Sequence, residues 1–260
     1  MAAANPTKWI SIGLLGLPLY GVLIFFSSLD PPPDPNTDYE AWAYYVSTTY
    51  YVLKHLFASI LGIVFALFGT IALGAYLSRS RAGGLGLVAM VITVFGYALF
   101  LTVMGVSTFA SPVEGQAYVG GDEEFAEIAA TGFAVTAQTL TILLFTVLLL
   151  VGNVLLGVAV WRSRTLPKWA GALWEAGAVL MFLLGLVVAQ LITGSIPVTW
   201  PVGSLLLVIS GGWMAWSVLR PFRLGGWRAP SPTEGAVTNP VFREVATRRV
   251  GNVKRASEVE

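Results

Sequence analysis

Long apolar runs, separated by short polar segments, dominate the first 220 residues of the chain. A helix of about 20 apolar residues crosses the hydrocarbon core of a bilayer. Helices are required there because lipid cannot satisfy bare backbone N–H and C=O groups, and the short alternating strands of a transmembrane barrel are not evident in these runs. The pattern predicts an all-α membrane protein of six spans in three hairpins, at about 9–27, 50–77, 85–106, 133–161, 169–191 and 202–219.

Part of this pattern occurs twice. Residues 37–81 match residues 120–164 after a shift of 83 positions, and both copies end in Arg-Ser-Arg. The identical positions include Glu40 and Glu123, Leu61 and Leu144, Gly69 and Gly152, and Gly74 and Gly157. Parallel duplication of a helix pair is one way in which transporters are built, whereas chance identity between two apolar helices is the alternative. We predict a true internal parallel repeat.

Each copy of the repeat begins with a short amphipathic segment. In the first copy Thr37 and Glu40 have the spacing of a capping box, which predicts a helix over 38–48. The corresponding helix of the second copy is predicted over 122–131, and Gly132 follows it as a bend. Because the first copy has no glycine there, we expect its helix to continue unbroken into the next span. Both short helices are expected to lie along the outer membrane interface.

Charge agrees with the membrane class and orients the spans. Only 11% of the residues are charged, compared with about a quarter in soluble domains. Fourteen of the fifteen Lys and Arg residues, all but Lys54, lie at the N-terminus, in the loops 79–81 and 162–168, or from residue 220 onward, whereas 28–49 and 107–132 are acidic. Short basic loops remain in the cytoplasm. We predict a plasma-membrane (inner-membrane) protein with both termini cytoplasmic.

Composition and charge divide the chain into two parts and indicate the kinds of partner to expect. Residues 1–220 form the transmembrane domain, and residues 221–260, rich in proline, glycine and charge, are expected to be a flexible cytoplasmic tail. The lipid bilayer is the expected environment, and a second membrane protein or another copy of the chain is a candidate partner. No nucleic-acid partner is expected.

The residues needed for most enzyme chemistry are scarce. The chain has no cysteine and a single histidine, which excludes thiolate nucleophiles and any metal site built from several imidazoles of one protomer. No predicted span contains an aspartate, so a carboxylate dyad within the membrane is not supported. We expect no metal site and do not favour an enzyme.

A polar group is predicted in the outer half of the bundle. Lys54 and His55 lie near the outer end of the second span, and the repeat pairs His55 with Gln138. Together with Thr139 and Gln190, these residues are candidates for a ligand-binding pocket. The alternatives are a lysine that extends to water and polar residues that only join helices by hydrogen bonds.

Glu175 is the second charged residue inside a predicted span. An ionisable group there costs roughly 2.5 kcal/mol or more at the centre of the membrane and indicates a functional site by default. Asn153, on the adjacent span, is a candidate hydrogen-bond partner, and pairing of Glu175 with Lys168, Arg162 or Arg79 is the structural alternative.

These observations favour a non-enzymatic membrane bundle that binds a small or lipidic ligand or acts as a subunit of a membrane assembly. The alternative is a small proton- or cation-coupled transporter in which Glu175 carries the coupling charge.

Overall fold

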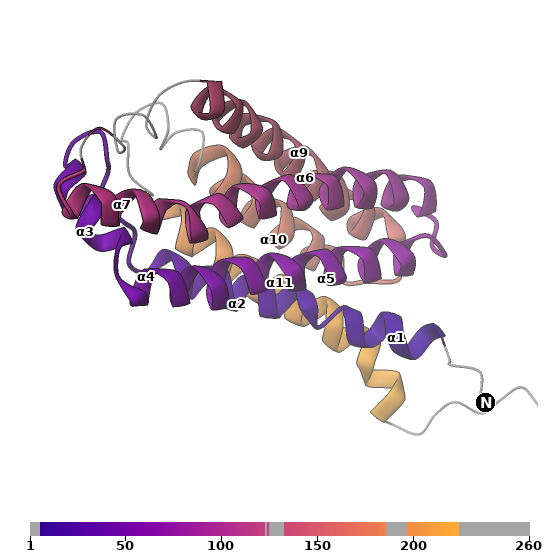
Figure 1. The fold of residues 1–260 in the computed structure, drawn as a ribbon. Coiled ribbons are helices and arrows are strands. Elements are labelled where there is room, and N and C mark those ends of the chain that lie inside the picture. Colours follow the sequence, from indigo (N-terminus) through magenta and orange to yellow (C-terminus); the bar gives the residue numbers. More distant parts are fainter. Residues whose placement is uncertain (1–5, 123, 125–132, 186–196, 224–260) are drawn as a thin grey trace, which may run out of the picture. The chain divides into compact units, whose positions relative to one another are not determined.

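The computed structural model describes residues 6–122, 124, 133–185 and 197–223. The chain divides into two compact units, Met1–Val218 and Leu219–Glu260, and the fold described below is that of the first. Its described residues form helices and no strand (Figure 1). Five helical segments are long and apolar enough to cross a membrane, namely Lys8–Ser28, Thr49–Leu77, Gly83–Val119, Val135–Ser163 and Thr199–Arg220. The prediction of an all-helical membrane protein is confirmed.

The first predicted span consists of two helices, α1 (Pro6–Gly13) and α2 (Gly16–Ser28). The chain turns between them, at Leu14 and Leu15. Pro18 has no N–H to donate to the carbonyl group four residues earlier, and its ring crowds that turn. The kink that Pro18 predicts therefore lies one turn before it.

The polar segment after α2 leads to α3 (Tyr39–Val46). The predicted helix is present, but its N-cap is not Thr37, because the Asp38 carboxylate accepts the hydrogen bond from the Ala41 N–H at 3.0 Å. The expectation that this helix continues into the next span was wrong. Thr48 has an extended backbone and caps a new helix by accepting from the N–H of Tyr51, and threonine is a favoured N-cap.

The second span is built from α4 (Thr49–Lys54), the π-helix η1 (His55–Ile60) and α5 (Leu61–Leu77). The third, α6 (Gly83–Phe109), is followed after one bend by α7 (Ser111–Val119). Residues 111–119 lie in the acidic segment 107–132, where no helix was predicted before residue 122, but a proline in the first turn favours a helix start. The second outer helix, predicted over 122–131, lies outside the described residues except for Asp122 and Glu124.

The remaining helices are α9 (Phe133–Ser163), α10 (Lys168–Ala178) and α11 (Thr199–Arg223), and α9 and α11 contain the last two candidate spans. Helix α10 continues as π-helical turns over 179–185. The rest of the predicted fifth span, including Gln190, lies outside the described residues.

Neighbouring helices pack closely where glycine replaces a larger side chain. A Cβ atom placed on the glycines shared by the two repeat copies would lie only 2.3–2.7 Å from the next helix: Gly69 from Leu17 of α2, Gly74 from Met90 of α6, Gly152 from Thr93 of α6, and Gly157 from Glu175 of α10. Helices α5 and α9 thus use glycines at matching sequence positions, α5 to contact α2 and α6, and α9 to contact α6 and α10. Small residues permit such close approach between helices in membranes.

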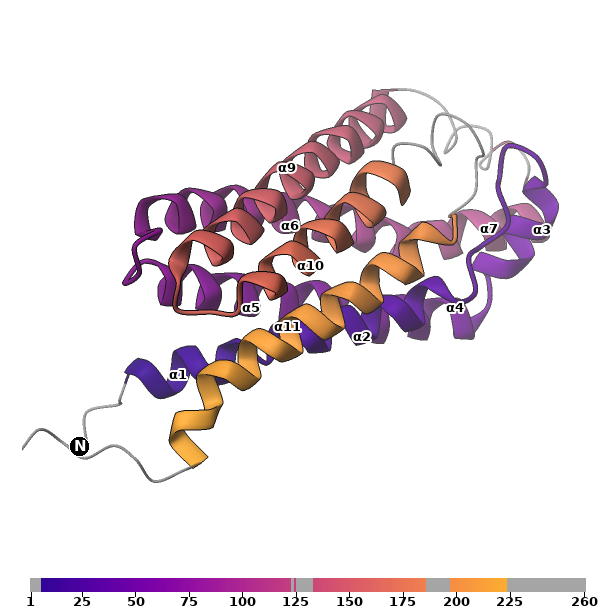
Figure 2. The same ribbon diagram turned by 180° about the vertical axis from the view of Figure 1, so that it is seen from behind.

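Helix α11 completes the arrangement by returning to the first span. Gly21 of α2 lies against Val208, and Gly177 of α10 lies against Leu207. Figure 2 shows α11 between α10 and α2. Large side chains fill the interior, including Tyr20, Tyr97, Phe145, Trp174 and Phe182.

Candidate functional site

The largest cavity that we describe is an apolar groove along α1, α2 and α5. It has a volume of about 560 Å³ and is lined by Trp9, Ile10, Ile12, Gly13, Leu15, Gly16, Leu19, Phe65, Phe68, Ile71, Ala72 and Ala75. We call this the α1–α5 groove. None of its lining residues carries a charge. Trp9 is 66% exposed and Phe68 is 61% exposed, so the groove opens on the outside of the bundle.

Two glycines shape the floor of the groove. A Cβ atom on Gly13 would lie 2.7 Å from the Ala72 Cβ atom, and one on Gly16 would lie 2.5 Å from the Phe65 carbonyl oxygen. The α1–α2 segment therefore approaches α5 almost backbone to backbone. The larger side chains diverge beside this contact and form the walls of the groove.

At one end the groove adjoins a smaller pocket of about 190 Å³ that contains an arginine. This pocket, which we call the Arg79 pocket, is lined by Ile10, Ser11, Tyr76, Arg79, Ser80 and Thr165. Ile10 lines both cavities, and Ala75 of the groove is followed directly by Tyr76 of the pocket. An apolar hollow and a guanidinium group thus lie next to each other.

The two Arg-Ser-Arg loops meet at this end of the bundle, since Thr165 of the second loop shares the pocket with Arg79 of the first. Both loops have the same local hydrogen bond. The Ser80 hydroxyl oxygen accepts from the Ala82 N–H at 3.1 Å, and the Ser163 oxygen accepts from the Thr165 N–H at 3.2 Å. This bond holds each loop in a defined turn beside its arginines.

A second basic cavity lies between residues of the two basic loops. It has a volume of about 240 Å³ and is lined by Arg81, Ala82, Gly84, Leu85 and Arg162. A second apolar groove, of about 450 Å³, follows α5, α6 and α9 and includes Ile71, Phe95 and Ala98. These two cavities share no lining residue with each other.

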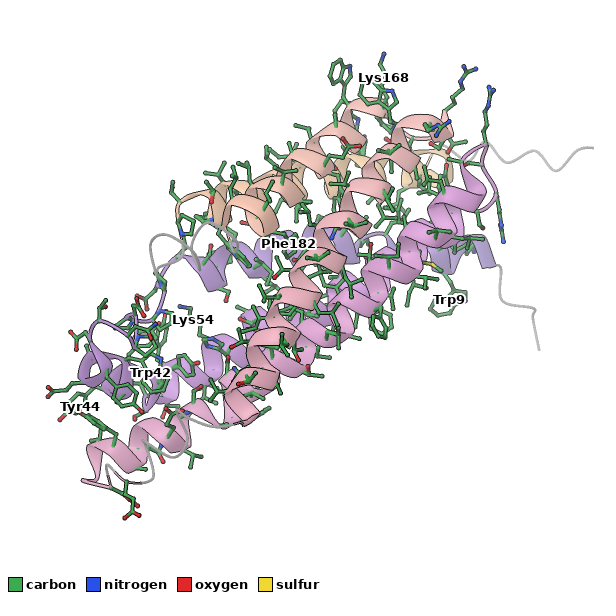
Figure 3. The ribbon with its side chains drawn as sticks, turned by 90° about the horizontal axis from the view of Figure 1, so that it is seen from above. Trp9, Trp42, Tyr44, Lys54, Lys168 and Phe182 are labelled. Carbon is green, nitrogen blue, oxygen red and sulfur yellow. The ribbon has the colours of Figure 1, made fainter. Side chains whose placement is uncertain are left out.

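The opposite end carries an aromatic and acidic cluster. The Lys54 ammonium group donates to the Asp30 carbonyl oxygen and to the Tyr45 hydroxyl oxygen, and the Tyr45 hydroxyl donates to an Asp30 carboxylate oxygen at 2.9 Å. Burial, followed by this hydrogen bond to Asp30, raises the pKa of Tyr45 above its usual range. Figure 3 shows Lys54, Trp42 and Tyr44 at this end, and Trp9 and Lys168 toward the other.

The predicted outer pocket is only partly assembled. Lys54 and His55 are neighbours, and the His55 ring lies 4.0 Å from the Tyr51 ring, centroid to centroid. Helices α4 and η1 pack on α2, α3, α5 and α6, whereas α9 packs on α6, α10 and α5. No hydrogen bond joins Gln138 or Thr139 of α9 to Lys54 or His55 among the described residues, and the Thr139 hydroxyl donates to the Val135 carbonyl oxygen.

Asn153 is buried, and its partner is Trp174 rather than Glu175. The Trp174 indole N–H donates to the Asn153 Oδ1 atom at 3.0 Å, while the Asn153 amide donates to the Leu149 carbonyl oxygen. Glu175, the next residue, packs against Gly157 of α9. Lys168 does not pair with it, because its ammonium group lies over the rings of Trp161 and Trp169.

In the sequence, the Arg-Ser-Arg loops indicated only which side of the membrane is cytoplasmic. The groove was not predicted. The sequence signal for a close helix contact at the groove was Gly13-x-x-Gly16, in the apolar segment that also contains Ile10 of the Arg79 pocket. No family model matches this chain, and no significant similarity to a curated protein or to a solved structure is found.

Proposed function

We propose that this protein is a non-enzymatic six-span membrane bundle that binds a membrane lipid, with an acyl chain in the α1–α5 groove. The groove is the observation that carries the proposal. Its volume of about 560 Å³ lies within the range of about 300–1,000 Å³ that is usual for ligand pockets, and its wall offers only apolar contacts. Hydrocarbon is the ligand that such a wall accommodates.

Its position supports a lipid rather than a soluble ligand. The groove lies between two candidate membrane spans, Lys8–Ser28 and Thr49–Leu77, and opens outward, so its occupant enters from the bilayer. An ordinary lipid-facing helix surface is convex. Here an acyl chain contacts the groove floor at Gly13 and the walls at Phe65 and Phe68 at the same time, which increases dispersion contacts.

The proposed topology has six spans, both termini in the cytoplasm, and a parallel repeat of 37–81 and 120–164. The equivalent contacts of Gly69 and Gly152 with the preceding helix, and the matching serine turns of the two basic loops, support this repeat. The meeting of both basic loops at one end supports a common cytoplasmic side.

Lipid retention tests the proposal. Purified protein in a mild detergent is analysed by native mass spectrometry, and we expect a retained mass of one lipid per protomer. Ala75→Phe inserts a ring into the groove and should reduce the retained fraction several-fold. Ala98→Phe, which places the same ring in the α5–α6–α9 groove, should leave it unchanged. Equal retention by both variants, or a second copy of the chain in place of lipid, would falsify the proposal.

A second candidate function rests on Glu175. This carboxyl group lies against Gly157 and has no ion pair with any residue that the structure describes, which suits a proton or cation site. Coupled flux in proteoliposomes tests it. A transporter of this kind loses coupling in Glu175→Gln, whereas flux that persists unchanged rules out the role.

A further inference from the structure

We infer that the occupant of the α1–α5 groove is an anionic phospholipid whose phosphate group binds at Arg79. The inference rests on the proposed function, because it identifies the lipid class that the groove takes. It adds the Arg79 pocket as the binding site of the head group, whereas the proposed function uses only the groove.

The first step is continuity. The groove and the Arg79 pocket share Ile10, and their walls follow one another along α5 from Ala75 to Tyr76. A ligand with an apolar chain in the groove therefore has its polar end beside the Arg79 guanidinium group. A diacyl phospholipid has this order of parts, an apolar chain joined to a phosphate.

The second step is charge. Among the residues that the structure describes, Arg79 forms no ion pair with a carboxylate, and the loops 78–82 and 162–167 contain no Asp or Glu. A guanidinium group presents paired N–H donors that match a phosphate. Basic pockets between helices on the cytoplasmic side of a membrane bind lipid head groups, and the Arg79 pocket has this position in the proposed topology.

The third step concerns the neutral groups. Ser80 and Tyr76 line the pocket together with Arg79. The Ser80 oxygen accepts from the Ala82 N–H, which leaves the hydroxyl proton available for a phosphate oxygen. Trp9, at the same end of the groove, is largely exposed, and tryptophan is favoured at the level of the head groups.

Arg81 provides a matched comparison. It belongs to the same loop, but it lines the cavity that contains Arg162 and shares no lining residue with the groove. A lipid held in the groove therefore contacts Arg79 and not Arg81. Replacement of either arginine removes one positive charge from the same loop, so an overall electrostatic effect is equal in the two variants.

The experiment compares phosphatidylglycerol with phosphatidylcholine of the same acyl chains, added in equal amounts to delipidated full-length protein and counted by native mass spectrometry. Wild type should retain phosphatidylglycerol about fivefold over phosphatidylcholine, the ratio expected for one arginine near a membrane surface. Arg79→Gln should lose this preference while still binding phosphatidylcholine, and Arg81→Gln should keep it. Unfolding midpoints of both variants equal to wild type exclude a folding defect.

Each other outcome has a defined meaning. Absence of any retained lipid defeats the proposed function itself. Retention of lipid without a preference, or an equal loss in the two arginine variants, overturns this inference alone. Inorganic phosphate is the third probe: if it binds wild type but not Arg79→Gln and displaces no lipid, the pocket serves a free anion and the assignment to a head group is wrong.

Discussion

Arg79 and Arg81 are separated by a single serine but line two different cavities. Arg79 lies beside the apolar groove, whereas Arg81 faces Arg162 of the other basic loop. The Ser80 hydroxyl bond to the Ala82 N–H fixes the turn between them. A sequence element that reads as one basic loop thus provides two distinct sites, and the two arginines can be tested against each other.

The shared glycines should be sensitive to the addition of one methyl group. A Cβ atom on Gly69 would lie 2.8 Å from the Leu17 backbone nitrogen, which cannot move like a flexible side chain. We expect Gly69→Ala to lower the free energy of unfolding by about 1–3 kcal/mol, the usual cost of overpacking, measured by denaturation in detergent. Gly105→Ala is the control, since a Cβ atom there meets nothing within 4 Å. A similar loss in both variants contradicts the packing role.

The bond between Asn153 and Trp174 should contribute measurably to stability. Trp174→Phe removes the indole donor and leaves the buried Asn153 oxygen without its partner, which carries a desolvation cost. Because the change also removes packing atoms, a double-mutant cycle with Asn153→Leu isolates the pair. We expect a coupling energy of about 0.6–2 kcal/mol, the range for such bonds between membrane helices. Additive effects of the two substitutions are the contrary result.

High pH should weaken the contact between α3 and α7. The Tyr39 hydroxyl donates to a Glu114 carboxylate oxygen at 2.8 Å, and burial, followed by this bond, raises the pKa of Tyr39. The folded state therefore favours the neutral phenol. Its contribution is fully present below the ordinary tyrosine pKa of about 10 and is lost as the pH rises above that value.

The measurement is the unfolding midpoint of wild type and Tyr39→Phe between pH 8 and pH 11. The stability of wild type should fall more steeply above pH 10 than that of the variant, which lacks the ionisable group. Parallel curves indicate that the Tyr39 bond does not couple to folding.

The proposed orientation can be tested directly because the chain has no native cysteine. We expect Thr37→Cys to react with a membrane-impermeant maleimide added to intact cells, and Gly84→Cys to react only after permeabilisation. Both residues are exposed, so accessibility to water does not distinguish them. The reverse pattern places the basic loops outside.

Apolar length and charge were sufficient to predict the membrane class and the positions of the long helices. Residue spacing also predicted the short helix before the second span, and Pro18 accounts for the kink in the first span. The break at Thr48 was missed because no glycine marks it, although Thr48 itself is a good N-cap. Helix α7 was missed because its acidic composition was read as a loop, despite Pro112 in its first turn.

The site was less predictable because hydropathy gives the depth of a residue but not the direction in which it faces. His55 and Gln138 occupy equivalent positions in the two sequence copies, but α6 packs against both of their helices, and the His55 ring is hydrogen-bonded to the Tyr51 carbonyl oxygen of its own span. A hydrogen bond between Asn153 and Glu175 was predicted because they lie on adjacent helices. In the structure the Trp174 indole N–H donates to Asn153 instead. Gly13-x-x-Gly16 marks a close helix contact, but it does not indicate that α5 is the neighbouring helix or which side chains line the groove.

Photo-crosslinking with a phosphatidylglycerol that carries a diazirine in its acyl chain tests the lipid-binding groove most directly. Full-length protein in mild detergent receives less than one probe per protomer, and the labelled peptides are mapped by mass spectrometry. We expect labelling to concentrate on 9–19 and 65–75 and to fall when unlabelled phosphatidylglycerol is added in excess. Labelling spread evenly over all lipid-facing helices, with no competition, would contradict a specific site.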